Sequence, residues 1–84
     1  MSTHVLKTDR LPFAALWRGE KRCEVRKNDR GFAVGDTLKL CERVAGVETG
    51  RAVFVIVTHM QTGYGLPDEL CVLSVEEIYR VHDW

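Results

Sequence analysis

Three ionisable side chains, Lys21, Glu24 and Arg26, fall within one short segment and suggest more chemistry than any other part of the chain. Alternation over residues 23–27 places Glu24 and Arg26 on the same face of a strand, with Lys21 just before it. Two cations that converge with a carboxylate can bind a phosphate or a polar heterocycle, and Lys21 and Glu24 can also serve as an acid–base or nucleophilic pair. The same spacing fits an exposed ladder of ion pairs, which contributes little to stability.

The stretch around this trio, residues 18–30, holds half of the basic residues of a chain whose formal net charge is zero. A local cationic surface on a neutral body can hold a phosphate-bearing ligand, such as a nucleic acid, at one place. The candidate phosphate contacts outside the trio are Lys7, Arg18, Arg22, Lys27 and Arg30. The aromatic residues that could stack on an unpaired base, or belong to the core instead, are Trp17, Phe32 and Tyr64.

The size and composition fit one small globular domain, spanning residues 1–84. The hydrophobic fraction of 45% and the charged fraction of 29% are ordinary for such a domain. No apolar run approaches the roughly 20 residues that cross a bilayer, and the first residues lack a signal-peptide pattern. We therefore expect a cytoplasmic protein with no membrane partner.

Cysteine and histidine are too scattered to predict a metal site. Cys23, Cys41 and Cys71 contain no closely spaced pair, and the three histidines are similarly far apart. We expect three buried free thiols, no metal and no cofactor.

The chain reads as several short strands with one early helix. A first strand is expected over residues 4–7, followed by a helix that begins near Leu11 and ends at a left-handed Gly19. Its apolar stripe runs from Leu11 through Ala14 and Ala15, and Phe13, Leu16 and Trp17 broaden the apolar side. Further strands are expected over residues 23–27, 37–42, 51–58 and 70–75, with a hairpin loop at 45–50 and a longer loop at 61–69. Residues 51–58 are apolar and β-branched enough to predict a central strand buried on both faces.

The last ten residues fit either a helical turn or an extended continuation of the preceding strand, and we favour the extended form. Five or more short, mostly antiparallel strands with one N-terminal helix predict an α+β domain built on a small, strongly curved sheet or barrel.

The chain resembles the ASCH domains of the PUA-like superfamily. The resemblance rests on Gly19-x-Lys21-x-x-Glu24-x-Arg26, followed by Val34-Gly35-Asp36 and an alternating strand. Further positions are similar to a compact branch common in phages and bacterial genomes: His4, Leu6, Lys7, Phe13, Val25, Lys27, Asn28, Asp29, Arg30, Phe32 and Thr49-Gly50-Arg51. The resemblance extends over nearly the whole chain up to Ser74.

This resemblance implies a small PUA-like β-barrel with a cleft lined by Lys21, Glu24 and Arg26, in a superfamily associated with RNA binding and RNA modification. Some ASCH relatives are amidohydrolases acting on acetylated cytidine through a lysine, a threonine and a glutamate, and others are nucleases acting on single-stranded RNA. Lys21 matches that lysine, Glu24 occupies the position of the threonine, and Glu69 is a candidate for the glutamate.

Three functions remain open from the sequence. The first is a module that binds single-stranded or structured RNA, or a modified nucleotide, through a basic cleft. The second is a small enzyme acting on RNA or a modified nucleoside, with Lys21 and Glu24 as catalytic groups. The third is an interaction protein that binds a partner through its acidic C-terminal tail, residues 76–84, which carries three acidic side chains.

Overall fold

The structure, a computed structural model, describes residues 1–82. It contains one helix and five strands. In chain order these are β1 (Thr3–Asp9), α1 (Arg10–Trp17), β2 (Cys23–Lys27), β3 (Thr37–Val44), β4 (Val47–Gln61) and β5 (Leu70–Val81).

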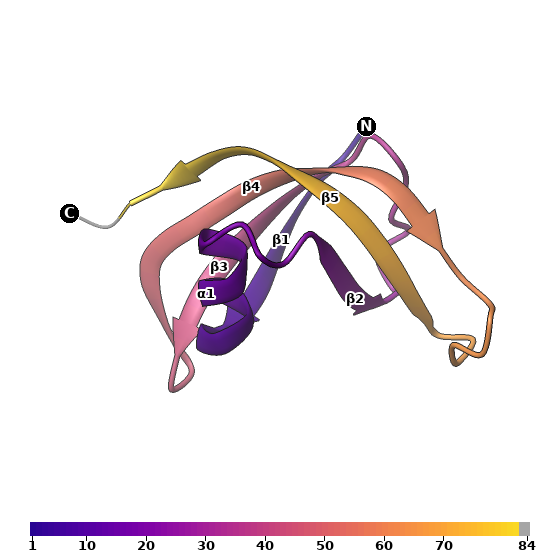
Figure 1. The fold of residues 1–84 in the computed structure, drawn as a ribbon, viewed down its shortest axis with the longest axis horizontal. Helices are drawn as coiled ribbons and strands as arrows, with labels where there is room; N and C mark the ends of the chain where they lie inside the picture. Colours follow the sequence, from indigo (N-terminus) through magenta and orange to yellow (C-terminus); the bar gives the residue numbers. More distant parts are fainter. Residues whose placement is uncertain (83–84) are drawn as a thin grey trace.

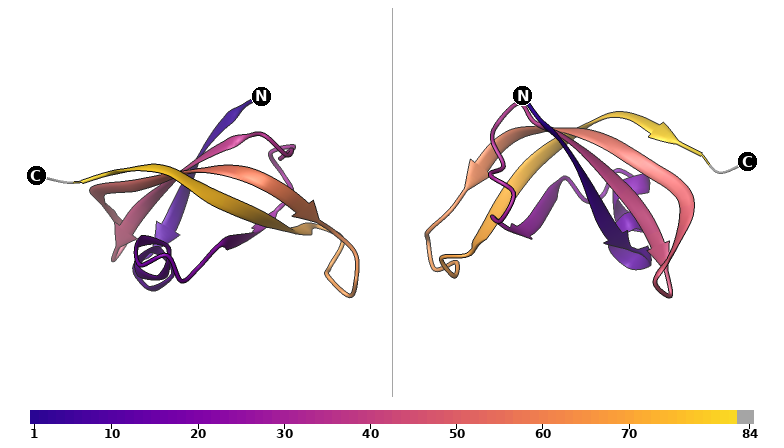
Figure 2. Two further views of the ribbon diagram at one scale, coloured as in Figure 1. Left: turned by 45° about the horizontal axis from the view of Figure 1, so that its top comes forward. Right: turned by 180° about the vertical axis from the view of Figure 1, so that it is seen from behind.

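The five strands form one sheet in the order β1-β3-β4-β5-β2. All neighbouring pairs are antiparallel except β1 and β3, which run parallel. A parallel pair needs a long connection, and here the connection from β1 to β3 contains α1 and β2. The sheet is curled into a half-barrel, and the long strands β4 and β5 arch over α1 (Figure 1). Two further views show the helix on the concave side only, which leaves the convex side without a helix (Figure 2). The expectation of a small, curved, mostly antiparallel α+β domain is confirmed at this level.

The core lies between the concave face and α1 and follows mostly from alternation along the strands, which is broken where the registers of β3, β4 and β5 shift. Leu38 and Leu40 of β3 are fully buried, as predicted, and lie beside Val53 and Val55 of β4. The prediction that residues 51–58 are buried on both faces is wrong, because Phe54 and Ile56 on the convex side are only partly buried and Thr58 is exposed. The strand is nevertheless central in the sheet.

The helix buries the large residues of the predicted apolar side and not the stripe at its predicted centre. Phe13 and Leu16 enter the core, whereas Leu11 is 74% exposed. The two large side chains bury more apolar area than the alanines of the predicted stripe, so they determine which face turns inward. Asp9 occupies the N-cap position without a capping hydrogen bond, and Gly19 adopts the predicted left-handed conformation, with φ of 77°.

The turn between β3 and β4 is tighter than the predicted loop over residues 45–50. Val44 pairs directly with Val47, and Ala45 and Gly46 both have positive φ, as a two-residue type I′ turn requires. An alanine with φ of 51° is unusual, and the glycine that follows it allows the turn.

The C-terminal segment is extended, as we favoured, because β5 continues to Val81 against β4. Residues 83 and 84, which belonged to the predicted tail, lie outside the described part of the chain. No helix within residues 1–82 has the length and apolarity needed to cross a membrane.

Candidate nucleic-acid interface

Lys21, Glu24 and Arg26 meet at one place, as the spacing predicted. The side chain of Glu24 is only 3% exposed and accepts hydrogen bonds from Arg26 Nε at 3.1 Å and Nη2 at 2.8 Å. Lys21 Nζ donates to the other carboxylate oxygen and to the carbonyl of Cys23. A buried carboxylate needs such partners, so Glu24 anchors both cations.

The alternation of β2 is inverted relative to an ordinary strand, and this inversion creates the site. Glu24 and Arg26 point inward, whereas Cys23 is exposed and Val25 is 57% exposed. The prediction of three buried thiols is therefore wrong for Cys23 and confirmed for Cys41 and Cys71. Burial raises the pKa of both of those thiols.

Arginine side chains span the opening between the two edge strands of the sheet. Arg26 Nη2 donates to the carbonyl of Lys7 at 3.0 Å, and Arg30 Nη1 donates to the carbonyl of Val5 at 3.0 Å. Both carbonyls belong to β1, whereas β2 lies at the opposite end of the strand order. The half-barrel is thus closed by side chains rather than by a backbone ladder, which leaves a groove between β1 and β2.

We call this feature the basic groove. It consists of two hollows of about 280 and 400 Å³ that share Val25 and Arg26 as lining residues. Its charged lining consists of the cations Lys7, Lys21, Arg26, Lys27 and Arg30 and the carboxylates Asp9, Glu24 and Asp29. Five cations against three carboxylates give the groove a net charge of +2 on a neutral chain.

Lys7 and Lys27 differ from the other cations of the groove. Both side chains are exposed, and across residues 1–82 neither ammonium group has a hydrogen-bond or ion-pair partner. They can therefore bind an incoming anion without breaking an existing contact.

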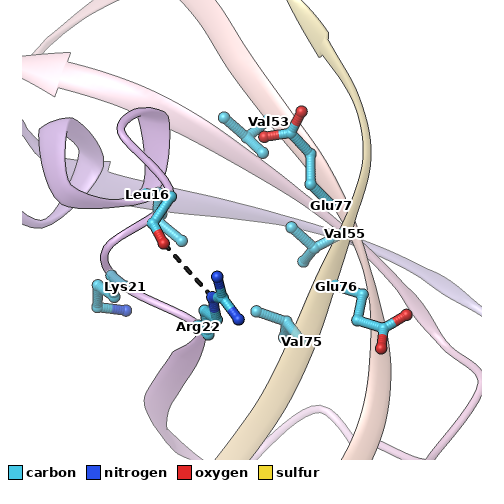
Figure 3. A pocket seen from close by; sticks show the side chains of 9 residues that line it. Leu16, Lys21, Arg22, Val53, Val55, Val75, Glu76 and Glu77 are labelled. Atoms are coloured by element: carbon cyan, nitrogen blue, oxygen red, sulfur yellow. Dashed lines mark hydrogen bonds between the residues drawn. The ribbon is translucent and has the colours of Figure 1, made fainter.

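A second pocket, of about 270 Å³, lies on the other side of Lys21 (Figure 3). We call it the Lys21 pocket. Its floor is apolar, and its charged rim consists of Lys21, Arg22, Glu76 and Glu77. Arg22 Nε donates to the carbonyl of Gly19 at 3.4 Å, the bond dashed in Figure 3, so Arg22 belongs to this pocket and not to the basic groove.

The other predicted contacts are distributed over the molecule. Arg18 is exposed and paired with Glu20, outside the groove. Phe32 is buried at the wall of the groove, with its ring 4.8 Å from that of His4. Tyr64 is 94% exposed in the loop between β4 and β5.

Trp17 and Glu69 do not line the basic groove, so they share no site with Lys21, Glu24 and Arg26. The ring centre of Trp17 lies 4.7 Å from the guanidinium carbon of Arg51 and 4.2 Å from that of Arg80. Glu69 lies next to Asn28, at the opposite end of β2 from Lys21, so the structure does not bring it to the trio.

Sequence reasoning missed two carboxylates that line a pocket together with Lys21. Glu76 and Glu77 were assigned to an acidic tail, but they belong to β5 and line the Lys21 pocket. Glu77 is held by Arg80, whose Nη2 also donates to the carbonyl of Trp17 at 3.0 Å. We predicted an extended form for the last ten residues, and a strand there could have been expected to bring Glu76 and Glu77 beside the trio.

A second buried ion pair was also missed. Glu42 is almost fully buried and accepts hydrogen bonds from Arg51 at 2.9 and 2.8 Å and from Thr49 at 2.7 Å. These bonds lower the pKa of the Glu42 carboxyl. The sequence did contain a sign of this pair, because alternation places Glu42 and Arg51 at inward positions of the predicted strands 37–42 and 51–58. This pair lies away from the basic groove and fastens β3 to β4.

Comparison with known proteins gives a family but no activity. Residues 3–75 match a family model described as a domain of unknown function, DUF3850. An uncharacterised 12.9 kDa protein in the GpA 3′ region of Escherichia phage P2 is 46% identical to this chain over 55 residues. That match covers 66% of this chain and 50% of the phage protein, so the chain spans about half the length of the relative. Since the family model covers most of the sequence, this chain belongs to the DUF3850 family.

Proposed function

We propose that this domain is an ASCH-type, PUA-like module that binds single-stranded RNA or a nucleotide in the basic groove. The observation that carries the proposal is the buried Glu24, which holds Lys21 and Arg26 in a concave site of net charge +2. Cations fixed in a hollow bind phosphate better than cations on flexible exposed side chains, because less conformational entropy is lost on binding.

The phosphate contacts would come from two kinds of cation. Lys7 and Lys27 provide unpaired ammonium groups at the rim. Arg30 donates to β1 through Nη1, which leaves its other N–H groups available to a phosphate oxygen. Arg26 uses Nε and Nη2 for Glu24 and β1, so its Nη1 is the group that stays available. This combination gives an affinity that depends strongly on salt.

The Lys21 pocket gives the same ligand a place for a base. Its apolar floor suits the face of a heterocycle, and the carboxylate of Glu77, whose strand position faces the same side as Val55, can accept a hydrogen bond from an exocyclic amino group. Lys21 lines both this pocket and one of the two hollows of the basic groove. A nucleotide whose phosphate binds Lys21 could therefore place its base in this pocket.

The test is a fluorescence-anisotropy titration of a labelled single-stranded RNA at several salt concentrations, comparing wild type with Lys7→Ala/Lys27→Ala. Removing two phosphate contacts should lower the slope of log affinity against log salt by about 1.4, at roughly 0.7 per contact. The matched control is Arg10→Ala/Arg18→Ala, which removes the same charge outside the groove. No binding by wild type at low salt, or equal losses in both double variants, would refute the proposal.

A second candidate, an enzyme on an acylated nucleoside, is favoured by one observation only. Lys21 shares its pocket with Glu76 and Glu77, so a lysine and a carboxylate line the same base-sized hollow. Glu24 is a weaker candidate for proton transfer than the sequence suggested, because both of its oxygens are already bound by cations. Incubation with acetylated cytidine should then give turnover that Lys21→Met abolishes. Absence of turnover, or turnover that survives this change, would remove the enzymatic function.

A further inference from the structure

The convex face of the sheet carries an ordered row of side chains that the basic groove does not use. The strand registers place Val5, Lys39, Phe54 and Tyr79 directly opposite one another across β1, β3, β4 and β5. No helix covers this face (Figure 2). Val5 is 56% exposed and Tyr79 is 53% exposed, so both ends of the row are open to solvent.

The middle of the row is a stack of rings. The rings of Phe54 and Tyr79 lie 4.5 Å apart and only 14° from parallel. Lys39 Nζ lies 5.7 Å from the centre of the Phe54 ring, on the β3 side. The stack therefore runs from a cation through two rings and ends at Tyr79, on the outermost strand at this level of the sheet.

Beyond Tyr79 there is room for one more flat ring. β2 pairs with β5 only over Leu70–Ser74, so within residues 1–82 no strand lies on the side of Tyr79 that faces away from β4. Neighbouring strands are about 4.8 Å apart, close to the stacking distance of two rings. A ring placed at the free edge of β5 would continue the stack with the same spacing.

The positive charge nearest the ring row comes from two lysines. The ring row and the two rows that flank it, Thr3-Thr37-Ile56-Glu76 and Lys7-Cys41-Ala52-Val81, hold the cations Lys7 and Lys39 and one carboxylate, Glu76. In the next row Arg43 pairs with Asp9 and Glu48, so the net positive charge lies in the three rows around the rings. Lys7 lies at the rim of the basic groove as well as on this face, one strand away from Lys39. The two lysines thus form a path from the groove over the β1 edge to the ring stack.

We infer that a single strand held in the basic groove continues over the β1 edge onto the convex face, where an unpaired base stacks on the open side of Tyr79. This inference rests on the proposed RNA-binding function and adds a second contact surface to it. The surface selects for unpaired bases and not for sequence, because every base has a face that can stack. Longer RNA should consequently bind more tightly than RNA that fills the groove alone.

The experiment compares labelled RNAs of about 4 and about 12 nucleotides, lengths that bracket small single-strand sites. Tyr79→Ala should weaken binding of the longer RNA by about 5- to 150-fold, corresponding to the loss of one base–aromatic stack, and leave the shorter RNA unaffected. Tyr79→Leu, which keeps an apolar contact with Phe54 but has no ring, should behave in the same way. Tyr64→Ala is the matched control, because Tyr64 is an exposed tyrosine outside the row, and it should change neither affinity.

The outcomes separate this inference from the proposed function. If wild type binds both RNAs equally and Tyr79→Leu changes nothing, the convex contact is refuted while groove binding stands. If wild type binds neither RNA, both proposals are refuted. Sedimentation of the RNA-free protein is a further check: a dimer that Tyr79→Leu dissociates would show that a second copy covers this face, which overturns the inference.

Discussion

Replacing Glu24 by glutamine should destabilise the domain far more than an average surface substitution. The carboxylate is 3% exposed and accepts three hydrogen bonds from Lys21 and Arg26, so the change leaves two cations without their counter-charge. Removing one partner of a buried ion pair typically costs about 3–5 kcal/mol. Because the side chains of Lys21 and Arg26 are 26% and 24% exposed and can reach water, we expect about 2–3 kcal/mol here.

Thermal and urea unfolding monitored by circular dichroism measures this loss. For a domain of this size, 2–3 kcal/mol corresponds to a fall in Tm of about 8–24 °C. The control is Glu20→Gln, which removes an exposed carboxylate paired with Arg18 and should leave Tm close to that of wild type, because an exposed ion pair is screened by water. A Glu24→Gln variant as stable as the control would refute the assignment of Glu24 as a buried anchor.

Three further predictions concern other parts of the fold. Asp36→Asn weakens the bonds to Ser2, Ala33 and His4 that lower the pKa of the Asp36 carboxyl, and should cost about 1.5–3 kcal/mol in urea unfolding at neutral pH. Because the folded-state pKa values of Asp36 and Glu42 are lowered, both carboxylates stabilise the wild type above about pH 4.5, and this contribution should be lost as the pH falls further; a wild-type stability that stays flat below that pH would contradict this. Cys23 should react with a thiol reagent in the native protein, whereas Cys41 and Cys71 should react only on unfolding; three equally fast thiols would contradict the burial pattern.

Alternation predicted most of the sheet because a one-residue shift would turn an apolar face to water. Leu38 and Leu40 were placed inward on this basis, and they are fully buried. The same reasoning could not orient β2, where the charged residues Glu24 and Arg26 point inward and Val25 points outward. That orientation depends on Lys21 and on the carbonyls of β1, which are distant contacts that no local pattern encodes.

The sequence predicted the trio of the candidate site but not the carboxylates of β5 that line the neighbouring pocket. The trio was identified because its three residues are near neighbours in sequence. Glu76 and Glu77 reach Lys21 only through the pairing of β5 with β2, and the sheet register is a property of the whole fold. Glu69 was proposed as a site residue from the sequence, but it lies at the end of β2 that is far from Lys21. Nothing in the local sequence shows this position, because it too depends on the sheet register.

The central claim is that the trio forms a ligand site and is not merely a structural ion pair. The triple variant Lys21→Met/Glu24→Leu/Arg26→Met tests it most directly, since replacing a whole buried ion cluster by apolar residues often leaves stability unchanged or higher. We predict that this variant folds with a Tm close to that of wild type and loses most of its affinity for single-stranded RNA at low salt. A folded triple variant that binds RNA as tightly as wild type would show that the three residues hold the sheet together and do nothing else.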